Sequence, residues 1–92
     1  MLDIIAEVLG TFFFVSVILF TGQPIPIAFA LLTSIYFTSL VSKGSMNPAV
    51  SLILLMKGDL SMGSSVLYII AEFAGAMIAL LWYNYAKANT SP

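Results

Sequence analysis

The sequence has 92 residues, of which 61% are hydrophobic and 8% charged, with a formal net charge of −1. A water-soluble domain of this size needs a mostly polar exterior, and this chain has too few polar side chains to build one. The near-neutral charge gives no electrostatic basis for binding nucleic acid. The sequence contains no Cys and no His, which excludes disulfides, thiolate or imidazole metal sites and His-based catalysis. We therefore expect a membrane protein without metal or cofactor.

Three apolar stretches are long enough to cross a bilayer, at residues 4–21, 25–42 and 65–86. A helix that crosses the hydrocarbon core needs about 20 residues, with about 17–25 tolerated. The first stretch follows no Lys or Arg and is interrupted by Glu7 and Gly10. We therefore interpret it as a retained span and not as a secretory signal. Segment 22–26 holds two prolines, which predicts a tight turn between antiparallel spans.

The third stretch has aromatic residues near both ends, with Tyr68 at its start and Trp82, Tyr83 and Tyr85 at its end. Aromatic rings favour the boundary between lipid and water, and Lys87 just beyond can extend to the headgroups. This pattern predicts boundary positions for all four rings.

Small residues recur in the spans at four-residue spacing. Ala71, Gly75 and Ala79 form one such series in the third span, and Gly10 lies in the first. Small side chains at this spacing let two membrane helices approach closely. We expect these residues to pack helix against helix.

The segment between the second and third spans contains signals for a short helix. Asn47 is a strong N-cap and Pro48 suits the first helical position, while Lys57 and Gly58 form a stop signal. About ten residues lie between these signals, or about 15 Å of helix, which is half a membrane. The lead-in at residues 43–46 must then be buried in protein or line a water-filled cavity. The predicted fold is an all-α membrane protein, one domain over residues 1–92, with three transmembrane helices plus one re-entrant half-helix.

Three motifs in this order resemble the first half of the aquaporin and glycerol-facilitator family. Residues 42–50 (SKGSMNPAV) resemble its pore loop, including the Asn47-Pro48-Ala49 triplet; residues 6–11 (AEVLGT) resemble its first-helix motif and residues 68–76 (YIIAEFAGA) its third-helix motif. The resemblance implies half of an aquaporin fold. It also implies a pore for water or small neutral solutes, made of two halves that are inverted in the bilayer and whose half-helices meet at the midplane.

The resemblance assigns roles to the pore-loop residues. The Asn47 amide would donate to a passing oxygen, and the carbonyls of Gly44, Ser45 and Met46 would accept along the pore wall. Pro48 and Ala49 would fix the start of the half-helix and permit contact with an opposing one. The alternative for Asn47 is a helix cap and nothing more, which explains Asn-Pro in many loops.

The sequence departs from the family pattern at several positions. Ser45 stands where relatives often have His, and the segment 29–47 is about two residues shorter. Phe29 matches an aromatic filter position, but the shortening leaves filter and lipid-facing roles equally open. Val50 stands at the filter-equivalent position, where the family's second half has Arg, so a pore of two copies lacks that arginine. Lys43 is either a headgroup anchor or a vestibule charge.

Glu7 and Glu72 both lie inside spans, where a carboxylate is costly and usually faces a partner in the bundle. The resemblance implies that Glu7 accepts hydrogen bonds from the pore loop. Glu72 stands where relatives commonly have Gln and should have a similar role. The alternative is that either carboxyl is protonated and only packs. No His or third carboxylate continues a proton path.

Two classes of function remain open from the sequence. The first is a half-channel that assembles with an inverted copy of itself or with a complementary half. The second is a non-conducting structural or assembly subunit of a membrane complex. Lys43 and Lys57 fall on one side of the predicted topology and Lys87 on the other, a bias weak enough to allow both orientations. An enzyme is disfavoured, since the sequence has no nucleophile–base pair, metal cluster or cofactor loop.

Overall fold

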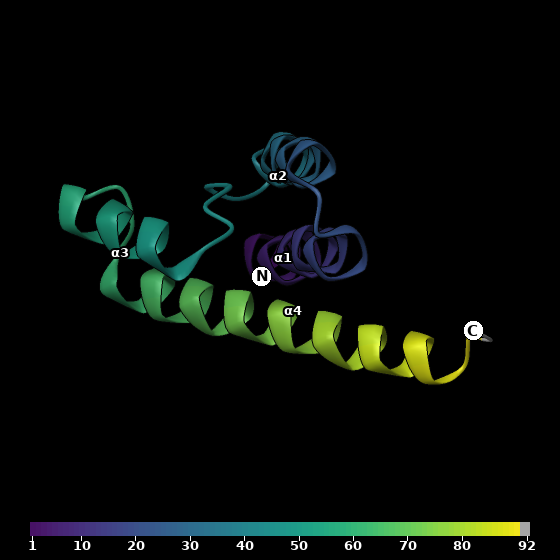
Figure 1. Ribbon diagram of the computed structural model, residues 1–92. Helices are drawn as coiled ribbons and strands as arrows, with labels where there is room; N and C mark the ends of the chain where they lie inside the picture. The colour runs from purple at the N-terminus through teal and green to yellow at the C-terminus, as the bar shows by residue number, and fades with distance from the viewer. Residues whose placement is uncertain (91–92) are drawn as a thin grey trace.

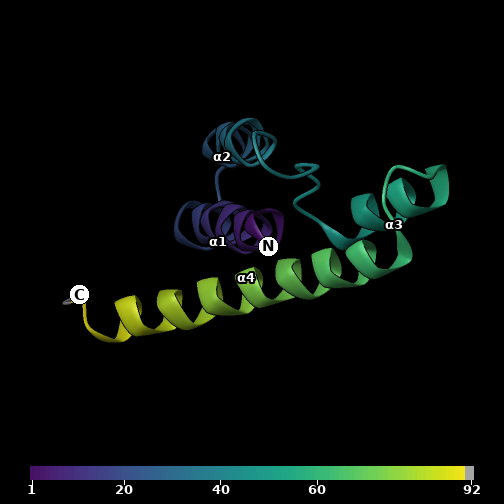
Figure 2. The same ribbon diagram turned by 180° about the vertical axis from the view of Figure 1, so that it is seen from behind.

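The computed structural model describes residues 1–90, which form four α-helices and no strand (Figure 1). In chain order these are α1 (Leu2–Thr21), α2 (Pro24–Thr38), α3 (Pro48–Lys57) and α4 (Met62–Ala88). α1 packs against both α2 and α4, and α3 packs against the first part of α4 (Figures 1 and 2). The prediction of an all-helical chain is confirmed.

The connection between α1 and α2 is shorter than predicted. α1 ends at Thr21, and Gly22 caps it in the left-handed conformation with a φ of 58°. α2 then begins at Pro24, so Pro24 and Pro26 belong to its first turn and not to the connection. Proline is tolerated there because the first N–H groups of a helix have no partner within it. The two helices pack as an antiparallel pair.

α2 is shorter than the predicted stretch 25–42, because it ends at Thr38 after 15 residues. The N–H groups of Val41 and Ser42 both donate to the Thr38 carbonyl, which closes a turn in place of further helix. The Ser42 hydroxyl donates to Glu7 on α1 at 2.7 Å, which draws the chain away from the α2 axis. A tertiary contact therefore sets this boundary, and local sequence does not reveal it.

Two helices among residues 1–90, α1 and α4, are long and apolar enough to cross a membrane. α2 and α3 are shorter apolar helices. At 1.5 Å per residue, α2 is about 22 Å long and α3 about 15 Å, against a hydrocarbon core of about 30 Å.

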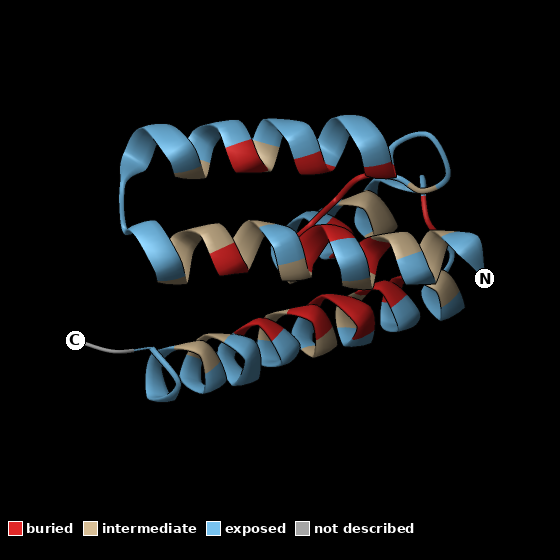
Figure 3. Ribbon diagram, turned by 90° about the vertical axis from the view of Figure 1, so that its right-hand side faces the viewer, coloured by how far each residue is buried: buried red, intermediate tan, exposed pale blue. Residues whose placement is uncertain are grey.

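Exposed residues run along all four helices, and buried residues face the places where the helices meet (Figure 3). The types of side chain in these two sets are the reverse of those in a soluble protein. Large apolar side chains are exposed along all four helices, among them Phe13, Leu32, Ile53, Phe73 and Leu81. Polar side chains make up much of the interior: Glu7, Thr11, Ser16, Ser34, Thr38, Ser45, Ser51, Ser65 and Glu72. An apolar exterior around a polar interior is stable when lipid surrounds the chain.

Small residues bring α1 and α4 into close contact. A β-carbon added at Gly75 would lie 2.5 Å from the Val8 carbonyl oxygen, so no larger residue fits without movement. Ala71 and Ala79, one turn away on either side, are 2% and 0% exposed. The predicted helix–helix packing is confirmed.

Trp82, Tyr83 and Tyr85 lie near the C-terminal end of α4. The Phe20 ring at the end of α1 lies 5.8 Å from the Trp82 ring and 5.2 Å from the Tyr83 ring, centroid to centroid. The Lys87 ammonium lies 5.6 Å from the centre of the Tyr83 ring. The contacts of Phe20 tie the ends of α1 and α4 together, and the contact of Lys87 with Tyr83 lies within α4.

Candidate functional site

α3 begins and ends at the residues that its sequence signals indicate. The Asn47 side-chain oxygen accepts hydrogen bonds from the N–H groups of Ala49 at 2.8 Å and Val50 at 3.1 Å. Pro48 is the first helical residue, and the helix ends at Lys57, followed by Gly58 with a φ of 95°. The ten-residue helix between Asn47 and Gly58 is therefore confirmed as a local structure.

The N-terminal end of α3 is an open surface. Asn47, Ala49 and Val50 are exposed and Pro48 is half-buried. Both capping hydrogen bonds use the Asn47 oxygen Oδ1, and the amide nitrogen Nδ2 forms no hydrogen bond within residues 1–90. Asn47 thus caps the helix and still has two N–H donors available.

The lead-in to α3 is an irregular segment that is buried against the helices. Gly44 and Met46 have φ values of 63° and 60°, which is unusual for a residue with a side chain such as Met46. Ser45 is 5% exposed and Met46 is 2% exposed. The Met46 thioether lies against Gly10 on α1, where an added β-carbon would come within 2.7 Å of the sulfur. The side chains of Ser45 and Met46 therefore face the interior of the chain.

Glu7 connects α1 to this lead-in. It is 0% exposed, and its Oε1 accepts from the Met46 N–H at 3.1 Å and from the Ser45 hydroxyl at 3.2 Å. Its Oε2 accepts from the Ser42 hydroxyl at 2.7 Å. The Ser42 oxygen in turn accepts from the Gly44 N–H at 3.0 Å. One buried carboxyl thus holds both ends of the segment 42–46.

Glu72 connects α4 to the same lead-in and to α3. It is 1% exposed, and its Oε2 lies 2.7 Å from the Ser45 hydroxyl and 2.9 Å from the Ser51 hydroxyl. Ser51 lies on α3 and is fully buried. The hydroxyls of Ser45 and Ser51 lie 2.8 Å apart. Within residues 1–90 no group of three or more Asp, Glu, His or Cys side chains could hold a metal ion.

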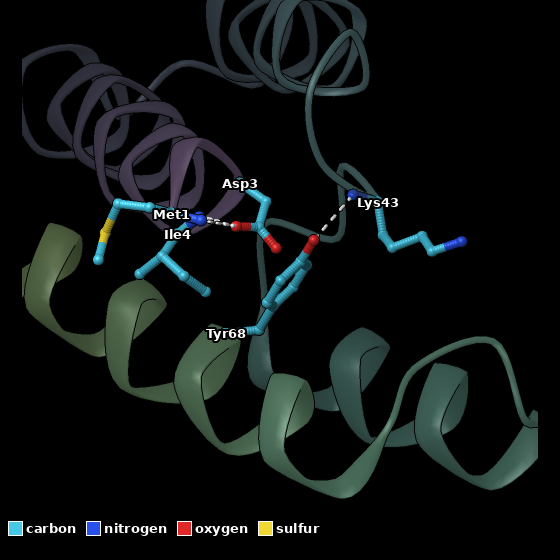
Figure 4. Close-up of polar contacts among 5 residues, drawn as sticks. All are labelled: Met1, Asp3, Ile4, Lys43 and Tyr68. Carbon is cyan, nitrogen blue, oxygen red and sulfur yellow. Dashed lines mark hydrogen bonds and ion pairs between the residues drawn. The ribbon is translucent and has the colours of Figure 1, made fainter.

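Tyr68 also supports the lead-in, which corrects the prediction that its ring lies at the lipid boundary. Tyr68 is 2% exposed, and its hydroxyl accepts from the Lys43 N–H at 3.2 Å (Figure 4). The Lys43 side chain is exposed and points away from Tyr68 and Asp3 (Figure 4). The ring is buried because the loop folds over it, an interaction that its position at a helix start does not reveal.

Sequence reasoning missed three residues that fix the loop: Ser42, Ser51 and Tyr68. Ser51 had a usable signal, since it is the only polar residue between Asn47 and Lys57. A lone hydroxyl in an apolar half-helix indicates a buried partner. Ser42 and Tyr68 had no comparable signal, because polar loop residues and aromatic residues at helix ends are common.

Phe29 is not part of this site in the structure. It lies on α2, 64% exposed. A cavity of about 190 Å³ adjoins Asn47 and Pro48, and Thr11, Phe14 and Phe73 help to line it. The structure therefore brings the start of α3 together with α1 and α4, and Phe29 does not line that cavity.

The comparisons with known proteins identify one family. The profile of the family described as major intrinsic protein matches residues 19–91 of the 92. No curated protein and no solved structure matches the chain. The matched range includes α2, α3, α4 and the loop 42–47, while residues 6–11 precede it. Members of this family are channels and not enzymes. The chain therefore belongs to the major intrinsic protein family, the aquaporin family of integral membrane channels for water or small solutes.

Proposed function

We propose that residues 1–92 form a single domain that is one half of a pore for water or small neutral solutes. A second half, inverted in the bilayer, completes the pore. The observation that carries this proposal is the free end of α3, where Asn47 exposes two N–H donors beside a helix N-terminus. Such donors are costly against lipid and favourable against a file of water.

The proposed arrangement in the bilayer has three crossings and one re-entrant helix. α1 and α4 are long enough to span, and α2 with the turn at residues 39–42 makes the third crossing. α3 is about 15 Å long, enough to reach the midplane from one side. The burial of Ser45 and Met46 supports this placement, because irregular backbone at membrane depth must be covered by protein or face a cavity.

The pore wall in this proposal has Asn47 as its principal donor. The carbonyls of Gly44, Ser45 and Met46 accept from the permeating solute once the second half is in place. The Phe29 ring is exposed on α2, and it narrows the pore if it turns toward the axis.

The second half docks at the free end of α3. Pro48, Ala49 and Val50 are the residues exposed or half-buried there, and the 190 Å³ cavity next to Asn47 receives part of the partner. The partner is either an inverted copy of this chain or a complementary half. In a pore of two copies Val50 occupies both filter-equivalent positions, so the constriction lacks a positive charge there.

The test is solute flux through liposomes that contain the purified protein, reconstituted by itself and with a complementary half. We expect water or a small neutral solute to cross faster than in empty liposomes, and Asn47→Ala to reduce that flux. Flux equal to that of empty liposomes in every combination would contradict the proposal. It would favour a non-conducting structural subunit instead.

A further inference from the structure

The cluster of Glu7, Ser45, Ser51 and Glu72 has more close oxygen–oxygen contacts than its hydroxyl hydrogens can satisfy. Glu72 Oε2, Ser45 Oγ and Ser51 Oγ form a triangle with sides of 2.7, 2.9 and 2.8 Å. Ser45 Oγ also lies 3.2 Å from Glu7 Oε1. Each hydrogen bond needs one hydrogen, and two serine hydroxyls supply two. The four contacts therefore have two hydroxyl hydrogens between them, and a hydrogen on a carboxyl oxygen would satisfy a third contact.

The cluster also lacks a positive charge. Glu7 and Glu72 are 0% and 1% exposed, and Oε1 of one and Oε2 of the other both lie within hydrogen-bond distance of the Ser45 oxygen. The ion pairs among residues 1–90 are Met1 with Asp3 and Lys57 with Asp59, so neither buried carboxyl takes part in one. Two buried carboxylates that share one site cannot both be ionised cheaply.

The other elements packed around the cluster add no neutralising group. α2 contains no charged residue. The Lys43 side chain of the loop is exposed and points away from Asp3 and Tyr68 (Figure 4). Asp3 on α1, one turn before Glu7, is paired with the Met1 ammonium. Tyr68 on α4 accepts from the Lys43 N–H through its hydroxyl.

The two carboxyls differ in the donors that they receive. Glu7 Oε1 accepts from the Met46 backbone N–H, a donor that cannot reverse, and Oε2 accepts from the Ser42 hydroxyl, whose oxygen is itself held by the Gly44 N–H. These donors stabilise an ionised Glu7. Glu72 receives serine hydroxyls alone, and a hydroxyl can accept as well as donate.

We propose that this cluster is a proton-binding site, in which Glu72 carries one proton and Glu7 is ionised. The Glu72 carboxyl donates its proton to Ser51, Ser51 donates to Ser45, and Ser45 donates to Glu7 Oε1. This chain of donors connects α4, α3, the loop and α1. The bound proton thereby holds the start of α3 against the two long helices. The proposal does not depend on whether the chain conducts.

Loss of this proton should lower the stability of the folded chain. Two negative charges would then face the same Ser45 oxygen in a region of low dielectric constant, which destabilises the folded chain. At neutral pH the folded chain holds a proton that the exposed Glu72 of an unfolded chain has already lost, because an exposed glutamate releases its proton at about pH 4.3. Stability therefore decreases as pH rises above about 4.3, by up to about tenfold in the folding equilibrium per pH unit, until the folded chain also loses this proton.

The first test is infrared spectroscopy of the protein in lipid at neutral pH. The carbonyl stretch of a protonated carboxyl has a frequency apart from those of carboxylate and amide bands, and this frequency shifts on transfer to D₂O. We expect wild type to show this band, Glu72→Gln to lose it, and the control Asp59→Asn, at an exposed surface ion pair, to keep it. A wild-type spectrum without the band overturns the proposal, as does a band that persists in Glu72→Gln.

The second test is the thermal midpoint in detergent as a function of pH, with sodium chloride or choline chloride as the salt. We expect the wild-type and Asp59→Asn midpoints to fall as pH rises from mildly acidic to alkaline in either salt, and the Glu72→Gln midpoint to change less. A wild-type midpoint independent of pH contradicts the proposal. A sodium-specific gain in midpoint that Glu72→Gln abolishes would also overturn it, because the occupant would then be a sodium ion.

Discussion

Glu7 accepts a 3.1 Å hydrogen bond from the backbone N–H of Met46, a residue 39 positions later in the chain. Met46 has a φ of 60° and immediately precedes Asn47, the cap of α3. A non-glycine residue in the left-handed region costs on the order of 1–3 kcal/mol and persists only where its surroundings hold it. The hydrogen bond to Glu7 is one such constraint, so a carboxyl on α1 helps to set where α3 begins.

The first prediction concerns substitution of Glu7. Glu7→Ala removes the acceptor of the Met46 N–H and of the Ser42 hydroxyl, and each buried group without a partner costs about 1–3 kcal/mol. Glu7→Gln keeps one acceptor oxygen and the size of the side chain. We expect thermal stability in detergent to fall from wild type to Gln to Ala. Equal midpoints for all three proteins would show that the carboxyl does not hold the loop.

The second prediction concerns the close approach of α1 and α4. Gly75→Ala places a methyl group 2.5 Å from the Val8 carbonyl oxygen, which forces the two helices apart. Overpacking of this kind costs about 1–3 kcal/mol, and the thermal midpoint should fall. Gly63→Ala is the matched control on the same helix, because no atom lies within 4 Å of the added carbon. We expect Gly63→Ala to be neutral or slightly stabilising, since alanine favours helix over glycine; similar losses from both variants would contradict the packing argument.

The third prediction concerns the Tyr68 hydroxyl. Tyr68→Phe keeps the buried ring but removes the acceptor of the Lys43 N–H, which should lower the free energy of unfolding by about 0.5–1.5 kcal/mol. Protease cleavage after Lys43 should also become faster, because the loop is held less firmly. Tyr83→Phe is the control, since the Tyr83 hydroxyl makes no hydrogen bond within residues 1–90. Unchanged cleavage in Tyr68→Phe would show that the hydroxyl does not restrain the loop.

The boundaries of α3 could be predicted because its signals are local. Asn is among the preferred N-cap residues, and a glycine in the left-handed conformation, such as Gly58, is a common end of a helix. The end of α2 could not be predicted in this way. Residues 39–42 are as compatible with helix as with turn, and the contact of Ser42 with Glu7 decides between them. Contacts between residues far apart in sequence leave no local pattern.

The same distinction between local signals and distant contacts applies to the candidate site. The cap at Asn47 followed from the sequence, and the hydrogen bonds of Glu7 to the loop agree with what the family resemblance implied. The contacts of Ser45 with both Glu7 and Glu72 did not follow, because they depend on how α1 and α4 lie on either side of the loop. The pore-lining roles of Gly44, Ser45, Met46 and Phe29 stay predictions.

The fourth prediction separates the two roles of Asn47. Asn47→Asp keeps an oxygen that can accept from the Ala49 and Val50 N–H groups, so α3 should remain capped. It replaces two N–H donors with a negative oxygen. We therefore expect the variant to reach the membrane with a thermal midpoint close to wild type. In liposomes, it should lose flux of neutral solute or admit cations.

The fifth prediction adds a charge at the neighbouring position. Val50 is 40% exposed at the free end of α3, so Val50→Arg places a guanidinium beside Asn47 without filling the core. If this end faces the pore, the positive charge repels cations and the longer side chain narrows the passage. Val50→Arg should therefore suppress any cation leak that the wild-type protein shows, and part of its flux of neutral solute. Met56→Arg is the control, since Met56 is exposed near the opposite end of the same helix. Water flux and ion conductance of liposomes are the measurements. Equal flux in wild type, Asn47→Asp and Val50→Arg would place the start of α3 outside any pore, because neither donors nor charge there would affect permeation.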